Sequence, residues 1–321
     1  MTEQSELFWH IESVALLREP GRLRALGAAL DSEPDFRVTH VGRSFPPGRA
    51  INGTFTDYLA GFHDRLKPAE QEMWFFERRD APHGAGDIYL LDNGRLRHNR
   101  AHELNGSFKD ARWFSSHERL ERLSRYLTRI ADAAGAFYGY CSAGEMLDQR
   151  LHLLQRSSGP IFGWIFHAGR AAHDRDRELP DVHWWNYFGP AFVERWDGRM
   201  DGLGARQATT PAGARVIWST ASPFVYDPSA SWLGAYAWKR PFYMALGDDT
   251  FMREGQKRGA VGELVPTWAD HYRAAGVDVS TLEGPEPPVI KGGLFPKVVR
   301  LRERPADTVD SDEPDGGGDG D

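Results

Sequence analysis

The chain has 321 residues, 40% of them hydrophobic and 12% aromatic, which is enough to fill the core of one large domain or two smaller ones. Lys and Arg number 39 and Asp and Glu 46, and the net charge of −7 falls entirely on seven acids after residue 304. The body, residues 1–304, has no net charge and therefore no net attraction for phosphate, so we expect no nucleic-acid partner. Residues 305–321 lack core-forming side chains, and we expect them to be a disordered acidic tail.

The sequence has three features that are typical of a cytoplasmic protein without membrane segments. Its apolar runs fall far short of the ~20 residues of a membrane-spanning helix, so we expect no membrane association. The first ten residues contain acids and no basic or apolar signal region, which predicts a cytoplasmic location. Cys141 is the single cysteine and has no partner for an intramolecular disulfide.

The N-terminal part alternates strand-like and helix-like stretches. Leu7–Leu16 reads as a strand, and Pro20–Leu30 as a helix with leucines on one face. Phe36–Val41 predicts a second strand, Ser44–Gly53 a loop rich in proline and glycine, and Phe55–Leu66 a helix.

The next stretch predicts an antiparallel hairpin. Glu72–Arg79 and Asp87–Leu91 read as strands, and Phe108–Phe114 as a further one. Asp92-Asn93-Gly94 has the composition of a type I′ turn, because Asn-Gly accepts positive φ values.

The strongest helical signal lies between residues 116 and 134. Its leucines and isoleucine recur at helical spacing, Ser115 and Glu118 fit a capping box, and Gly135 provides a C-terminal stop. Ala136–Cys141 then reads as a strand. Cys141 lies among aromatic residues, so we interpret it as a small core residue and not as a nucleophile.

The middle of the chain offers a candidate metal site. We expect a helix over Met146–Leu154, a strand over Ile161–Phe166 and a possible lobe boundary near 159–160. Imidazoles and carboxylates that could share a divalent ion cluster just beyond: His167, His173, Asp174 and Asp176. Arginines interleave with them and would pair with the aspartates first, so we expect no metal and no cofactor.

Residues 179–197 concentrate three tryptophans, a tyrosine and two phenylalanines. Val182–Tyr187 predicts a buried strand, and Pro190 fits the first turn of a helix that continues to Trp196. The simplest interpretation is that this segment is a structural element of the core, because aromatic side chains are usually buried.

This segment resembles one found in bacterial immunity proteins, which protect cells against toxins of type VI secretion and related polymorphic-toxin systems. The resemblance is carried by Leu179, Pro180, Val182, Trp184, Asn186, Tyr187, Phe188, Gly189, Pro190, Phe192 and Val193. A second, weaker resemblance is Phe137-Tyr138-Gly139-Tyr140 followed by Gly144-Glu145. The resemblance implies a cytoplasmic protein that binds and neutralises a cognate toxin without catalysis.

The C-terminal part adds further elements. Gly198–Gly213 is polar and rich in glycine, which predicts a loop, while Arg215–Ser219 and Pro241–Leu246 read as strands. Val265–Ala275 predicts a last helix with Pro266 in its first turn. Since the strands cluster without regular βαβ alternation, we expect an α+β fold with a mostly antiparallel sheet packed with helices, in one body or two lobes.

A partner site is predicted at Asp227–Trp238, where Trp232, Tyr236 and Trp238 alternate with Ser, Ala and Gly. This composition is typical of binding loops, because rigid rings supply contact area and small residues let the backbone adapt. The alternative is a loop whose rings fold back into the body.

Two classes of function remain open. The first is the toxin-binding immunity protein, which needs a shaped surface. The second is a hydrolase or transferase whose catalytic residues converge only in the folded chain. A deep pocket with several shifted acids or histidines would favour the second, and an open aromatic and polar face the first.

Overall fold

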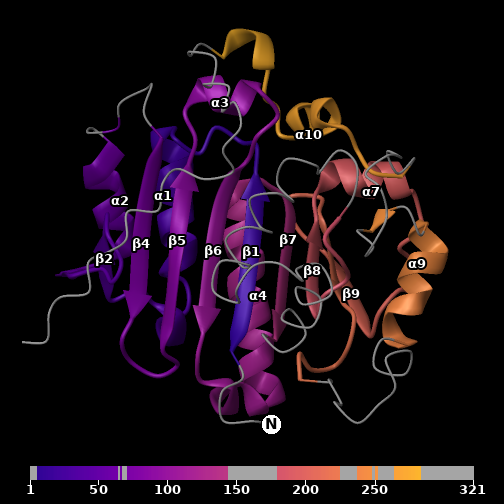
Figure 1. Cartoon of the computed structure of the whole chain (residues 1–321), viewed down its shortest axis with the longest axis horizontal. Coiled ribbons are helices and arrows are strands. Elements are labelled where there is room, and N and C mark those ends of the chain that lie inside the picture. The colour runs from indigo at the N-terminus through magenta and orange to yellow at the C-terminus, as the bar shows by residue number, and fades with distance from the viewer. Residues whose placement is uncertain are drawn as a thin grey trace, which may run out of the picture. The chain divides into compact units, whose positions relative to one another are not determined.

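Among the residues described by the computed structural model, ten antiparallel strands form one sheet, in the order β3-β2-β4-β5-β6-β1-β7-β8-β10-β9 (Figure 1). The structure describes residues 6–63, 66, 71–143, 179–224, 237–247, 250–251 and 264–282. All of them belong to one unit, Met1–Pro287. The strands are β1 Leu7–Ser13, β2 His40–Gly42, β3 Arg49–Ala50, β4 Glu72–Arg78, β5 Gly84–Leu90, β6 His102–Phe108, β7 Ala136–Ala143, β8 Trp185–Phe188, β9 Arg206–Thr209 and β10 Arg215–Trp218. The predicted α+β class is confirmed.

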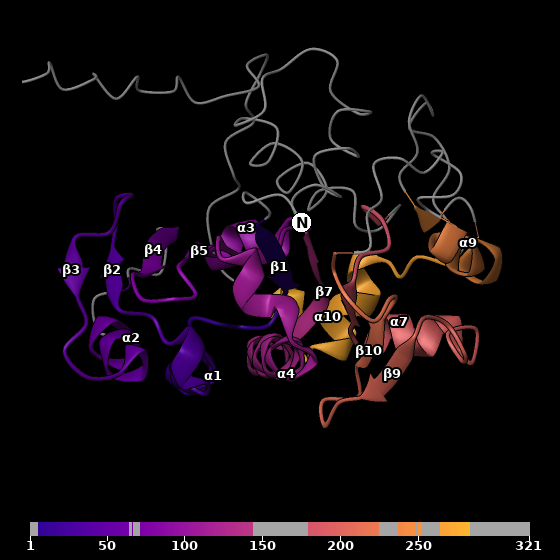
Figure 2. The same ribbon diagram turned by 90° about the horizontal axis from the view of Figure 1, so that it is seen from below.

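Helices cover both faces of this sheet. The α-helices are α1 Pro20–Leu30, α2 Phe55–His63, α3 Asn93–Arg97, α4 His117–Ala134, α7 Pro190–Trp196, α9 Arg240–Leu246 and α10 Trp268–Ala274. Helices α1, α2 and α4 lie on one face and share a large hydrophobic cluster with it (Figure 2). Helices α7, α9 and α10 share a second cluster with β7, β8 and β10. None of the described helices is long and apolar enough to cross a membrane.

Close packing of α1 against α2 depends on a glycine and an aspartate. A Cβ on Gly27 would lie 2.7 Å from the Thr56 Cα, so only glycine allows this approach. The Asp31 carboxylate, just after α1, accepts hydrogen bonds from the backbone N–H groups of Phe55 and Thr56 at 3.0 and 2.9 Å. It thereby caps the N-terminus of α2 and fixes the angle between the helices.

Helix α4 follows its sequence pattern closely. Leu120, Leu123, Leu127 and Ile130 are buried, and Gly135 ends the helix at a φ of 59°, where glycine has no steric penalty. The predicted capping box at Ser115 is wrong. Ser116 is the N-cap, and its hydroxyl accepts from the Arg119 N–H, because helical geometry begins one residue later than the pattern suggested.

Strand β7 is buried along its whole length, since both faces of the sheet are covered there. Next to it, β8 begins at Trp185, three residues later than predicted. Trp184 and Trp185 are 2% and 0% exposed and belong to the same hydrophobic cluster. In a strand starting at Val182, Trp184 and Trp185 would point to opposite faces of the sheet. Because Trp184 precedes β8, both rings instead belong to one cluster.

Three predictions in the N-terminal half are wrong. Only the end of Phe36–Val41 is a strand, because Pro34–Phe36 forms a 3-10 helix. Asp92 does not begin a hairpin: its carboxylate accepts from the Arg95 N–H at 2.9 Å and caps α3. The stretch after Phe108 leaves the sheet, and a 3-10 helix spans Ala111–Ser115.

Three predictions in the C-terminal half are also wrong. The predicted loop Gly198–Gly213 contains β9, an edge strand whose residues are mostly exposed. The predicted strand Pro241–Leu246 is α9, in which Phe242 and Leu246 are buried one turn apart while Met244 is 76% exposed. Helix α10 starts after Thr267, so Pro266 precedes its N-cap. Residues 146–154 and 161–166 and the boundary near 159–160 lie outside the described residues.

We predict that Trp185→Ala lowers the free energy of unfolding by about 3–5 kcal/mol, because truncating a fully buried ring leaves a cavity. Urea titration of the full chain measures this change. Phe45→Ala is the control, since Phe45 is 58% exposed and its loss should cost about 0.5 kcal/mol or less. Equal losses in the two variants would contradict the core assignment.

Candidate functional site

The structure describes one of the three residues predicted to bind a partner. Trp238 lies in the 3-10 helix Ala237–Lys239, is half-buried, and packs against the second hydrophobic cluster. The ammonium group of Lys239 lies 5.1 Å from the centroid of its ring. Trp232 and Tyr236 lie outside the described residues, so their role in binding a partner stays a prediction. The four residues of the candidate metal cluster also lie outside them, and the expectation that they bind no metal stays a prediction.

In the immunity-like segment, residues 179–197, Asn186 and Gly189 stabilise the packing of β8. The Asn186 Oδ1 accepts from the His183 N–H at 2.8 Å, and its Nδ2 donates to the His183 carbonyl, the Ile217 carbonyl and the Ser219 hydroxyl at 2.7, 3.2 and 3.0 Å. Asn186 thus ties β8 to β10 and to the preceding turn. A Cβ on Gly189 would lie 2.7 Å from the Phe137 Cα, so this position needs glycine.

A buried ion pair joins the start of this segment to α9. The Lys239 ammonium contacts the Asp181 carboxylate, and the two side chains are 4% and 2% exposed. The Tyr243 hydroxyl donates to the other carboxylate oxygen of Asp181 at 2.7 Å. Beside them the ring of Tyr140 stacks on His183, with centroids 4.1 Å apart. Sequence reasoning missed this cluster, because its members are far apart in the chain.

Polar side chains form a chain of hydrogen bonds across β5, β6 and β1. The Asn105 Nδ2 donates to Asp87 Oδ1 at 3.0 Å, which turns the Asn105 Oδ1 toward His10 Nδ1 at 2.5 Å. His10 Nε2 lies 2.6 Å from Glu12 Oε1. Both ring nitrogens of His10 therefore face oxygen atoms, an arrangement that a doubly protonated imidazole satisfies. Burial raises the pKa of Asp87, and the hydrogen bond from Asn105 opposes this.

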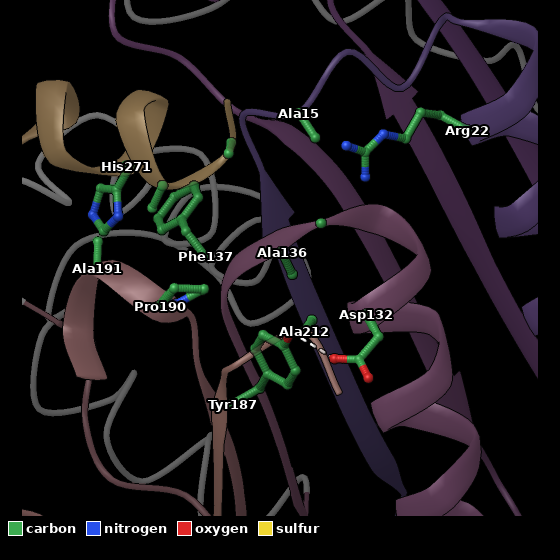
Figure 3. A pocket seen from close by; sticks show the side chains of 13 residues that line it. Ala15, Arg22, Asp132, Ala136, Phe137, Tyr187, Pro190, Ala191, Ala212 and His271 are labelled. Atoms are coloured by element: carbon green, nitrogen blue, oxygen red, sulfur yellow. Dashed lines mark hydrogen bonds between the residues drawn. The ribbon is translucent and has the colours of Figure 1, made fainter. Parts of the chain in front are cut away.

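A pocket of about 160 Å³ opens where α1, α4, β7, β8, α7 and α10 converge (Figure 3). Its polar walls are Arg22, Asp132, Tyr187 and His271, and Phe137 supplies an aromatic wall. The remaining described residues that line it are small: Ala15, Gly135, Ala136, Pro190, Ala191, Ala212, Ala274 and Ala275. A concave, mostly apolar pocket with a few convergent polar groups is the usual form of a ligand site.

Within this pocket Tyr187 donates its hydroxyl to Asp132 Oδ1 at 2.8 Å (Figure 3). Burial raises the pKa of Asp132, while the hydrogen bond from Tyr187 opposes this. Burial, with the nearby Asp132 charge, raises the pKa of Tyr187 far above its ordinary value, so its phenol stays protonated. The pair therefore acts as a fixed donor and acceptor.

The shifted Asp132 predicts a pH effect on stability. Its pKa is raised above the unfolded value of about 3.8, so folding disfavours its charged form and stability falls as pH rises through that window. Asn at this position keeps the oxygen that accepts from Tyr187 and cannot ionise. We expect Asp132→Asn to gain stability relative to the parent chain between pH 4 and pH 7, measured by urea titration at each pH. The exposed Asp80→Asn should show no such trend, and a flat difference for Asp132→Asn would contradict the expectation.

The buried pair makes a separate prediction. Lys239→Met leaves the Asp181 carboxylate buried without its ammonium partner, so we expect a loss of about 3–5 kcal/mol in the free energy of unfolding. The matched control is Arg195→Met, which breaks a more exposed pair with Asp270 and should cost about 1 kcal/mol or less. Similar losses in both variants would show that the Lys239 pair does not behave as a buried one.

Comparison with protein-family models finds no match, and comparison with curated proteins finds none either. Among solved structures, a T6SS protein of Pseudomonas aeruginosa is similar to this chain, with a TM-score of 0.53 and 13% sequence identity. The likeness covers 84% of this chain and 81% of that protein. At this identity the comparison shows a related fold over most of both chains.

Proposed function

We propose that this chain is an immunity protein of a type VI secretion system that binds and neutralises a cognate bacterial toxin. The observation that carries the proposal is the related fold of a T6SS protein over 84% of this chain. The type VI secretion system is named for the Pseudomonas aeruginosa protein, and we propose that this chain also belongs to such a system. The segment at residues 179–197 supports the proposal independently, because its resemblance to immunity proteins lies in its amino-acid sequence and not in the fold.

The buried positions of that segment fit this proposal. Asn186 and Gly189 hold β8 against its neighbours, and Trp185 and Phe188 are fully buried. A segment with this role specifies a fold and leaves the surface to recognise a partner. Sequence resemblance in the core, together with a partner-specific exterior, is what a family of proteins against different toxins requires.

The one cysteine has the properties of a core residue. Cys141 is fully buried, and burial raises the pKa of its thiol far above the ordinary value. Since the thiolate is the nucleophilic form, this position opposes nucleophilic catalysis by Cys141. The activity that we propose for the chain is stoichiometric binding of the toxin.

Deletion of the gene tests the proposal directly. A recipient strain without the gene should be killed by its parent strain in contact culture, and the gene supplied on a plasmid should restore survival at least tenfold. A parent strain with an inactivated secretion system should not kill. Purified chain should inhibit the toxin at one-to-one ratio, whereas full inhibition by a small fraction of an equivalent would indicate an enzyme. Survival of the deletion strain would contradict the proposal.

The predicted partner site can be tested in the same assay. We expect Trp232→Ala and Tyr236→Ala to abolish protection without changing the melting temperature, because rigid rings supply binding energy at interfaces. Trp238→Ala should also lower the melting temperature, since Trp238 is half-buried against the second cluster. Parallel loss of protection and stability in the first two variants would assign those rings to the core.

A further inference from the structure

We propose that the pocket beside Arg22 receives a carboxylate side chain of the partner protein, and that Arg22 recognises it. This inference rests on the proposed function, because it identifies part of the surface that would meet the toxin. It concerns a site remote in sequence from Trp232 and Tyr236.

The pocket exists because the side chains around it are short. Eight of its 13 described lining residues are Ala, Gly or Pro, so the walls end at or near Cβ and leave about 160 Å³ open. This volume is several times the roughly 30 Å³ that one water occupies in the liquid. It therefore has room for a short side chain that enters from outside.

The pocket is also reachable. Ala212 and Ala274 line it and are exposed, and Arg22 is half-buried. Figure 3 shows the Arg22 side chain extending from α1 toward Ala15, apart from the hydrogen-bonded Asp132 and Tyr187. A Cβ on Gly135 would lie 3.3 Å from Arg22 Nη1, so a larger residue there would crowd the guanidinium.

Arg22 brings hydrogen-bond donors to the pocket that the Asp132–Tyr187 pair does not use. Asp132 accepts a hydrogen bond from Tyr187, so these two side chains are already engaged with each other. In the part of the chain that the structure describes, Arg22 makes no hydrogen bond, ion pair or ring contact. A guanidinium presents five N–H donors and no acceptor, so its occupant must supply acceptors.

A carboxylate fits these donors better than other anions. Its two oxygens match the planar guanidinium in a bidentate pair. Asp132 lies in the same pocket, and its carboxylate would repel a second negative charge there. A singly charged carboxylate adds less repulsion than a phosphate, and its short apolar stem matches the alanine walls.

Binding of small probes to the full chain tests the site without the toxin. We expect butyrate to bind, measured by ligand-observed NMR and calorimetry, and to bind more tightly than inorganic phosphate or butylammonium. Arg22→Gln should weaken butyrate binding about tenfold or more, the usual effect of losing a hydrogen bond to a charged group. Arg24→Gln is the matched control, because Arg24 is an exposed arginine on the same helix and does not line the pocket.

Complex formation tests the occupant. Arg22→Gln and Ala274→Leu, which fills the pocket from its exposed rim, should weaken the toxin complex at unchanged melting temperature, whereas the exposed Ala28→Leu on α1 should not.

The proposal is overturned if butyrate binds equally well to Arg22→Gln, or if phosphate or butylammonium binds more tightly. It is also overturned if removing residues 305–321 raises butyrate affinity, because the acidic tail would then be the occupant. If gene deletion shows no immunity, the partner assignment fails, while butyrate binding that depends on Arg22 would still mark a carboxylate site.

Discussion

Coverage of the sheet on both faces at β7 and β8 is the constraint on which the rest of this structure depends. Strand β7 is buried throughout, and β8 beside it carries Trp185 and Tyr187 toward one cluster and Phe188 toward the other. Polar groups enclosed there must find partners inside the protein, because an unpaired buried group is costly. Asn186 meets this demand with bonds to a turn and to β10, and the Asp181 carboxylate meets it with Lys239 and Tyr243.

Sequence patterns identified those elements whose local signal and tertiary environment agree. Helix α4 combines an apolar stripe and a glycine stop that both act as the pattern indicates, and only its N-cap differs, at Ser116 in place of Ser115. Helix α9 was misassigned because a six-residue apolar run fits a strand and a helix equally well. Its helical state is visible only in the burial of Phe242 and Leu246 one turn apart. Asp92 shows the same ambiguity, because a turn former also caps a helix.

The candidate site was beyond sequence reasoning for a different physical reason. The pocket is assembled from segments between Ala15 and Ala275, and most of its described lining residues are Ala, Gly or Pro, which carry no chemical signal of their own. What defines it is the space that larger side chains would occupy, and that space depends on how α1, α4 and α10 approach β7. The ion pair of Asp181 and Lys239 joins residues 58 positions apart, which no local pattern reports.

Tyr187 links the fold to the pocket. It belongs to the segment that carries the resemblance to immunity proteins, its ring is buried in the larger cluster, and its hydroxyl forms a wall of the pocket with Asp132. Burial raises the pKa of the Asp132 carboxyl, and the hydrogen bond from Tyr187 opposes this, so the pair balances a cost of burial against a contact across the pocket. Because all four residues of β8 are buried, the same packing that forms the core also fixes the position of Tyr187 in the pocket wall.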